Sequence, residues 1–149
     1  MARKRQGIRR SVRTFVLDVS VTMAWFFTDE TDAYAEAVED SLAHAGAIVP
    51  TLWPLEVANT LVVGERRKRS TEAQAATWLS YVRALPITLD DETATRAWGD
   101  TLNLARTHQL SAYDAAYLEL AMRDGLPLAT LDERLAKAAG AVGVAKYEP

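Results

Sequence analysis

The sequence predicts an α/β fold, with one domain built in three layers and a central parallel sheet flanked by helices on both faces. Short apolar runs alternate along the chain with longer segments of helical periodicity, which is the pattern of parallel strands joined by crossover helices. The chain has 149 residues, of which 49% are hydrophobic and 25% are charged. It is therefore long enough to bury one core of ordinary composition.

Short apolar runs mark the expected strands. These strands cover residues 15–19, 47–49, 87–89, 126–129 and 142–146. The first of them, beginning Phe15-Val16-Leu17, has no polar alternation, which is typical of a strand buried on both faces. Pro50 closes the second run, and Pro86 separates the third run from the helix before it.

Helices are expected at residues 20–27, 31–45, 51–69, 71–85, 91–108, 111–123 and 132–139. Ser20 and Thr51 are placed to cap the first and third of these helices, and Thr71 forms a capping box with Gln74 in the fourth. Gly46 and Gly125 are placed to end the second and sixth helices, because glycine readily adopts the left-handed conformation found there.

Residues 1–14 form a basic arm that is distinct from the domain predicted at residues 15–149. The arm contains six basic residues and no acid, whereas the remainder carries 11 basic and 20 acidic side chains, a net charge of −9. Such an arm is expected to be solvated and disordered. The alternative is an arm that contacts nucleic acid phosphates or a partner protein.

The composition limits which metal ligands the protein can offer and in which cellular compartment we expect it. Without cysteine the chain has neither disulfides nor a thiolate zinc site, so oxygen atoms are the natural metal ligands. No run of about twenty apolar residues is present, and the acidic pair Asp29-Glu30 stands where a signal peptide would need small residues. We expect a cytoplasmic protein that does not enter a membrane.

Four acidic residues follow strands or begin helices in four separate motifs. They are Asp18, Glu56, Asp114 and Asp132. Each one alone is explained by helix capping or by the helix dipole. In an open α/β sheet, however, ligands bind at the carboxyl ends of the strands, where these four side chains are expected to converge.

Convergence of four carboxylates would require a counter-charge. At a separation of about 5 Å and an effective dielectric of 20, each pair repels by roughly 3 kcal/mol. A hard divalent cation relieves this repulsion, and all-oxygen ligation suits Mg²⁺ or Mn²⁺. Such a site is suited to phosphodiester cleavage. The four acids are therefore our candidates both for metal ligands and for catalytic residues.

Smaller polar residues beside the acids are candidates for supporting the metal site through hydrogen bonds. They are Ser20, Asn59, Ser111 and Thr130, of which Ser20 and Ser111 are equally explained as plain N-caps. The candidates for phosphate contact are basic: Arg134, Arg66, Arg67, Lys68 and Arg69. For the last four, the alternative is a solvated helix C-terminus.

Four strings in this order resemble the PIN-domain ribonucleases, and specifically the VapC-type toxins of bacterial toxin–antitoxin pairs. The strings are Leu17-Asp18-Val19-Ser20-Val21, Trp53-Pro54-Leu55-Glu56-Val57-Ala58-Asn59-Thr60-Leu61, Leu110-Ser111-Ala112-Tyr113-Asp114-Ala115-Ala116-Tyr117-Leu118 and Leu128-Ala129-Thr130-Leu131-Asp132-Glu133-Arg134-Leu135. The family's acidic quartet falls on the four acids named above. The resemblance implies a Mg²⁺- or Mn²⁺-dependent endoribonuclease, a homodimer and inhibition by a cognate VapB-type antitoxin.

Two other functions compete with RNA cleavage. One is a non-catalytic regulator that keeps the PIN-like fold, binds a metal and acts through a protein or nucleic-acid complex. The other is a phosphatase with an aspartyl nucleophile, which would need a second acid two residues after Asp18, where Ser20 stands.

Overall fold

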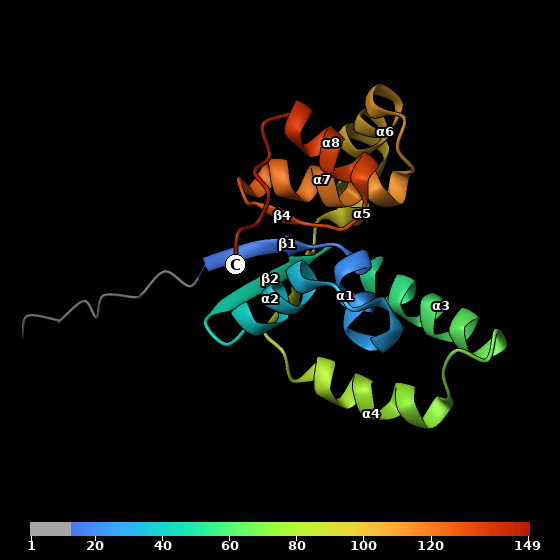
Figure 1. Ribbon diagram of the computed structural model, residues 1–149. Coiled ribbons are helices and arrows are strands. Elements are labelled where there is room, and N and C mark those ends of the chain that lie inside the picture. The colour runs from blue at the N-terminus through green and yellow to red at the C-terminus, as the bar shows by residue number, and fades with distance from the viewer. Residues whose placement is uncertain (1–12) are drawn as a thin grey trace, which may run out of the picture.

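The computed structural model describes residues 13–149 and confirms the three-layer α/β architecture (Figure 1). The sheet is parallel, with the strand order β3-β2-β1-β4. Its strands are β1 (Arg13–Leu17), β2 (Ala45–Val49), β3 (Ile87–Leu89) and β4 (Leu128–Ala129). All of its strands run in one direction, so their carboxyl ends share one edge.

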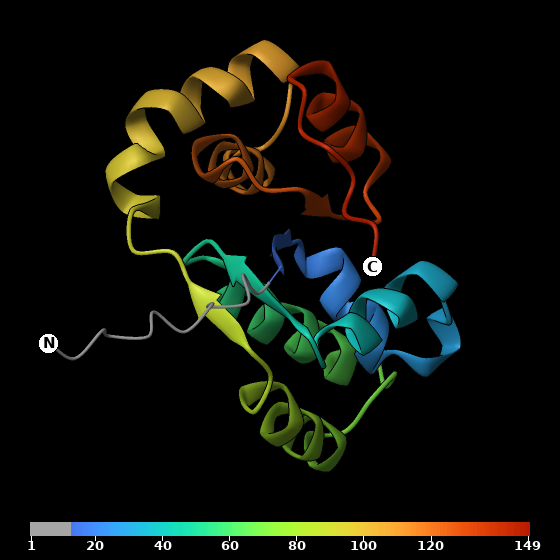
Figure 2. The same cartoon turned by 90° about the vertical axis from the view of Figure 1, so that its left-hand side faces the viewer.

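Helices from the two halves of the chain cover opposite faces of the sheet (Figures 1 and 2). One face carries α1 (Val19–Phe26), α2 (Ala33–Ser41), α3 (Trp53–Arg66) and α4 (Glu72–Arg83). The other carries α5 (Thr93–Arg96), α6 (Leu102–His108), α7 (Ala112–Asp124) and α8 (Glu133–Ala141).

The strand order places a topological switch point between β1 and β4. From β1 the chain moves to β2 and then to β3, and it returns to β4 on the opposite side of β1. Leu17 pairs with Ala129, so Asp18 and Thr130 follow their strands at the same level. Crevices at such points are where open α/β sheets bind ligands.

The last three residues of β1 are fully buried, whereas Arg13 and Thr14 are exposed. Phe15, Val16 and Leu17 are each 0% exposed, as expected for a strand covered on both faces. Phe15 stacks on Tyr147 with 3.8 Å between ring centroids, and the Tyr147 hydroxyl is hydrogen bonded to Ser41. The C-terminal segment is thereby anchored beside β1.

Three predicted helix boundaries are wrong. Ser20 lies inside α1, which begins at Val19 with Asp18 in the N-cap position. Gly46 does not end a helix, because it is paired with Thr14 inside β2, and α2 ends earlier, at Ser41. The N-cap position of α3 is Leu52 and not Thr51. In each case strand pairing or the path between elements overrides a local capping preference.

Other local predictions are confirmed. The capping box of Thr71 and Gln74 begins α4, and Gly125 ends α7 in the left-handed conformation, with φ of 64°. The helix predicted at residues 91–108 is present but interrupted, because a π-type turn (Ala97–Thr101) separates α5 from α6 around Gly99. Bulges of this kind are a recognised cause of helix kinks.

The two ends of the chain differ from expectation. The strand predicted at residues 142–146 is reduced to one parallel bridge between Lys146 and Leu128. At the other end, β1 begins at Arg13, and the Arg13 guanidinium donates a hydrogen bond to the Glu148 carbonyl. The domain therefore begins no later than residue 13, and the rest of the predicted arm lies outside the described residues.

A buried ion network ties α7 to the end of β3. The Arg123 guanidinium donates to both carboxylate oxygens of Asp90, at 2.8 and 3.0 Å, and to both of Glu119, at 2.8 and 3.0 Å. Asp90 is 4% exposed, and the Arg123 contact lowers its pKa. Within residues 13–149, no helix is long and apolar enough to span a membrane.

We expect Arg123→Met to destabilise the protein by about 3–5 kcal/mol, because it leaves two buried carboxylates without their counter-charge. The free energy of unfolding in urea measures this loss. Arg106→Met, at an exposed position on α6, is the matched control and should change stability by less than about 0.5 kcal/mol. Equal stability of the two variants would contradict the structural role of the network.

Candidate functional site

The structure brings the four predicted acids together at the switch-point edge. They come from the end of β1, the first turn of α3, the first turn of α7 and the N-cap of α8. Burial raises the pKa of Asp18, and the charges of Asp114 and Asp132 raise it further. Glu56 is coupled in the same way to Asp18 and Asp114. The four side chains therefore form one electrostatic group.

Asp18 is the most deeply buried member of the group, at 2% exposure. The Ser20 hydroxyl donates to its Oδ2 at 2.5 Å, and the Thr130 hydroxyl donates to the same atom at 2.8 Å. Backbone N–H groups of Leu131 and Asp132 donate in turn to these two hydroxyl oxygens. The orientation of Asp18 is thus fixed through one oxygen, and its other oxygen receives neither hydroxyl.

Glu56 contacts a residue that our sequence analysis did not single out. The hydroxyl of Tyr117, which is 0% exposed, donates to Glu56 Oε1 at 2.6 Å. Burial raises the pKa of Glu56 to about 7, against the opposing effect of the Tyr117 hydrogen bond. Tyr117 lies three residues after Asp114, on the same face of α7, and this spacing was the signal available in the sequence.

Asp114 and Asp132 each take part in a helix cap. Ser111 accepts a hydrogen bond from the Asp114 backbone N–H at 3.1 Å, and Asp132 Oδ1 accepts from Leu135 N–H at 2.9 Å. Burial and the charge of Asp132 raise the pKa of Asp114, whereas Arg134 opposes the rise. The Asp132 carboxylate therefore also caps α8, whereas at α7 the capping side chain is that of Ser111 and Asp114 contributes its backbone N–H.

Arg134 is the basic side chain that the fold places beside the acids. Its charge lowers the pKa of Asp114, against the effect of burial. Its guanidinium donates a hydrogen bond to the Gln109 carbonyl at 2.8 Å. Gln109 ends α6 with φ of 54°, in the left-handed region that few non-glycine residues adopt. The guanidinium thus holds the connection between α6 and α7 next to the site.

The other predicted basic residues lie elsewhere. Arg66 ends α3, about 15 Å along the helix from Glu56, and Arg67, Lys68 and Arg69 follow it. Arg69 is paired with Asp29 at 3.4 Å and lies over the Phe27 ring. These four basic residues therefore lie at the far end of α3 from the acidic group. Asn59 is exposed and lies one helical turn beyond Glu56, so its supporting role stays a prediction.

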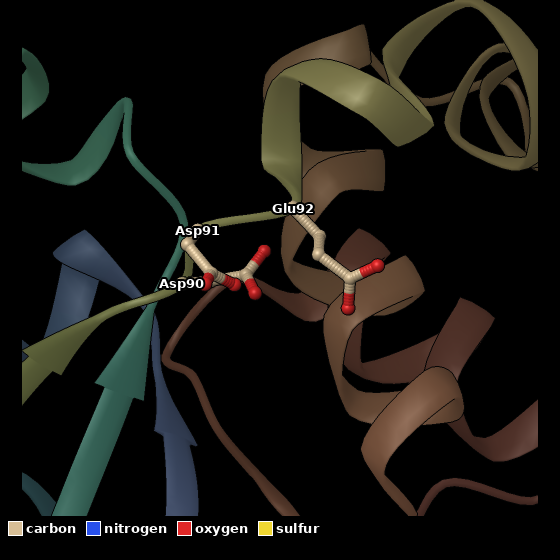
Figure 3. A group of neighbouring side chains, drawn as sticks. All are labelled: Asp90, Asp91 and Glu92. Carbon is tan, nitrogen blue, oxygen red and sulfur yellow. The ribbon is translucent and has the colours of Figure 1, made fainter.

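A second acidic cluster lies between β3 and α5, as Figure 3 shows. Asp90, Asp91 and Glu92 can offer oxygen atoms within 4.8 Å of one another, closer than the four acids of the switch point. Arg123, however, already donates to both oxygens of Asp90 and to one of Glu92. The Arg123 guanidinium therefore already provides a counter-charge for this cluster.

The acidic group at the switch point fits a divalent ion through its donor chemistry. Its ligands are carboxylates only, and the charges that raise the pKa values of Asp18, Glu56 and Asp114 are those of its own members. Its wider spacing suits Mg²⁺, which keeps several water ligands and binds directly to few carboxylates. The fold and the site together define a candidate metal-using hydrolase of the α/β class.

The comparisons with known proteins agree with this class. The family model described as "PIN domain" matches residues 15–141, and the chain therefore belongs to the PIN-domain family. Ribonuclease VapC3 from Pyrobaculum aerophilum is 30% identical over 122 residues, which cover 82% of this chain and 92% of that protein. These findings support a nuclease, and PIN nucleases use divalent metals.

Solved structures share the fold. PAE2754 from Pyrobaculum aerophilum superposes with a TM-score of 0.60 at 18% identity, covering 86% of each chain. FitAcB from Neisseria gonorrhoeae superposes with a TM-score of 0.50 at 22% identity, covering 91% of this chain and 97% of the other.

We expect Tyr117→Phe to raise the pKa of Glu56 above about 7, because the lost hydrogen bond stabilises the ionised carboxylate. More Glu56 is then protonated at pH 7, so Mn²⁺ affinity should fall there and recover at higher pH. Calorimetric titration with Mn²⁺ across pH measures the shift. The control is Tyr147→Phe, which removes a buried hydroxyl at a distance from the acids. Identical pH profiles for the two variants would count against the role of Tyr117.

Proposed function

We propose that the protein is a Mg²⁺- or Mn²⁺-dependent endoribonuclease that acts as a cytoplasmic toxin and is inhibited by a cognate VapB-type antitoxin. The observation that carries the proposal is the gathering of Asp18, Glu56, Asp114 and Asp132 at the switch-point edge. Membership of the PIN-domain family and similarity to a VapC ribonuclease support it. Asp18, Glu56, Asp114 and Asp132 are the proposed metal ligands.

Each residue has a separate part in this proposal. When bound, a divalent ion supplies Lewis-acid polarisation of the phosphate and makes water a better nucleophile. Ser20 and Thr130 orient Asp18 by donating to its Oδ2. Tyr117 holds Glu56 through Oε1, which orients this carboxylate as a metal ligand. Arg134 keeps positive charge beside Asp114.

We expect Asp18→Asn to lower the rate of RNA cleavage by at least about a hundredfold, because it removes a charged ligand at the centre of the group. Cleavage of single-stranded RNA in Mg²⁺ or Mn²⁺, with and without EDTA, measures the loss. Expression of the wild type should arrest growth, and expression of the variant should not.

Asp91→Asn is the matched control, because it removes an exposed carboxylate from the second acidic cluster. It should retain cleavage, metal dependence and toxicity. If Asp91→Asn lost activity while Asp18→Asn retained it, the metal would belong at the end of β3. A wild-type protein that binds Mn²⁺ but never cleaves RNA would favour a non-catalytic regulator.

We extend the proposal to a homodimer. A groove of about 410 Å³ between α3, α4 and β3 is lined mostly by apolar side chains, among them Val57, Leu61 and Leu85. Leu89 lines the same groove and is 49% exposed. Apolar surface left open on a single chain supports a protein partner there.

We expect sedimentation to give twice the chain mass of 16.4 kDa, and Leu89→Glu to shift the protein to a monomer by placing a charge in an apolar contact. Met122→Glu changes a similarly exposed side chain outside the groove and should leave the mass unchanged. A wild-type monomer at every concentration would refute the dimer without bearing on cleavage.

A further inference from the structure

We propose that the cavity between α8 and the C-terminal segment is a nucleotide subsite, in which Lys146 binds a phosphate of the RNA strand beside the cleaved bond. This inference rests on the proposed ribonuclease function and adds a binding site for the substrate. The cavity has a volume of about 450 Å³, within the range of small-molecule sites.

The cavity borders the acidic group and shares residues with it. Thr130 and Asp132 line it, and the same two residues belong to the switch-point edge, where Thr130 donates to Asp18. A strand whose phosphate lies at the acids would therefore reach the cavity with an adjacent nucleotide.

The backbone places Lys146 at a suitable distance. Lys146 pairs with Leu128 on the outer side of β4, two residues before Thr130. Two residues along a strand and one strand across correspond to about 8 Å between Cα atoms. This separation is close to the spacing between neighbouring phosphates in an extended strand, and the lysine side chain adds further reach.

The Lys146 ammonium is held on the cavity wall by Tyr34. It lies 4.4 Å from the centroid of the Tyr34 ring, within the range of a cation–π contact. The Tyr34 hydroxyl donates to the Tyr147 carbonyl at 2.7 Å, which fixes the ring. Lys146 is the basic residue that lines this cavity, and no carboxylate within the described residues forms an ion pair with it.

The acidic residues of the cavity are compatible with a bound nucleotide. Asp32 and Asp132 cap the N-termini of α2 and α8, each through one oxygen, so their charges are partly balanced by helix dipoles. The remaining oxygen of Asp32 and the exposed Glu133 carboxylate accept hydrogen bonds only, whereas the free oxygen of Asp132 belongs to the proposed metal site. The oxygens of Asp32 and Glu133 suit the exocyclic amino groups of adenine, cytosine or guanine, whereas Lys146 suits the phosphate.

The test compares Lys146→Ala with Lys137→Ala, which removes the same charge from an exposed position on α8 outside the cavity. Both are made in an Asp18→Asn background, and the anisotropy of a fluorescein-labelled single-stranded RNA gives Kd at several salt concentrations. Lys146→Ala should weaken binding roughly 3- to 10-fold at low salt and lower the slope of log Kd against log salt by about 0.7. Lys137→Ala should change neither quantity.

Two additional measurements separate phosphate binding from a structural role. Lys146→Arg should restore the affinity and the slope, because it keeps the charge. In otherwise wild-type enzyme, Lys146→Ala should raise KM for RNA and leave kcat and Mn²⁺ affinity unchanged. The substituted side chain takes no part in the backbone bonds on either side, from Leu128 N–H to the Ala145 carbonyl and from Tyr147 N–H to the Leu128 carbonyl.

An unchanged Kd and slope for Lys146→Ala, or no recovery with Lys146→Arg, would overturn the subsite. The same holds if Lys146→Ala spares RNA binding but weakens binding of a protein inhibitor, which would assign the cavity to that protein. A failure of the ribonuclease proposal would give a different experimental result from a failure of the subsite. In that case the wild-type protein would cleave no RNA with any divalent ion.

Discussion

The structure depends on how the carboxylate of Asp18 is accommodated at the end of a strand whose last three residues are fully buried. Asp18 is 2% exposed and lies near other carboxylates, a position that disfavours ionisation both through desolvation and through like charge. The Ser20 and Thr130 hydroxyls offset part of this cost, and a divalent cation would offset more. Because these hydroxyls come from α1 and from the residue after β4, the Asp18 carboxylate links the start of α1 to the end of the neighbouring strand β4.

The site also requires the helices on the two faces of the sheet to keep a fixed position relative to each other. Glu56 projects from α3 on one face of the sheet, and Tyr117 projects from α7 on the other, yet the two are 2.6 Å apart. A small rotation of α7 would break this contact and move Asp114 as well. Arg123, two turns further along α7, binds Asp90 at the end of β3 and restrains that rotation. The Arg123–Asp90 ion pair thus ties α7, which carries Asp114 and Tyr117, to the end of β3.

Sequence patterns predicted the α/β class, four of the strands and the convergence of the acids, because buried apolar runs and strand ends follow from local composition. They failed where pairing partners decide the outcome. Gly46 has the local properties of a helix stop, yet its pairing with Thr14 places it in β2. The spacing of Tyr117 from Asp114 places both on one face of α7, but it does not reveal the contact with Glu56, which spans 61 positions. Arg123 resembles a basic residue at a helix C-terminus until the fold brings Asp90 to it.

The proposed binding of RNA depends on where the cations of an acidic protein lie. The chain carries a net charge of −3, and four of its carboxylates lie where the proposed reaction would place a phosphate. Arg134 reaches toward the connection between α6 and α7, whereas Lys146 lies on the outer side of β4. Thr130 and Asp132 lie in the chain between β4 and α8, close to both cations. In this arrangement the two fixed cations would attract the phosphates on either side of the cleaved bond. The phosphate at the acids would then be left to the divalent ion, which would explain why the acidic group itself contains no lysine.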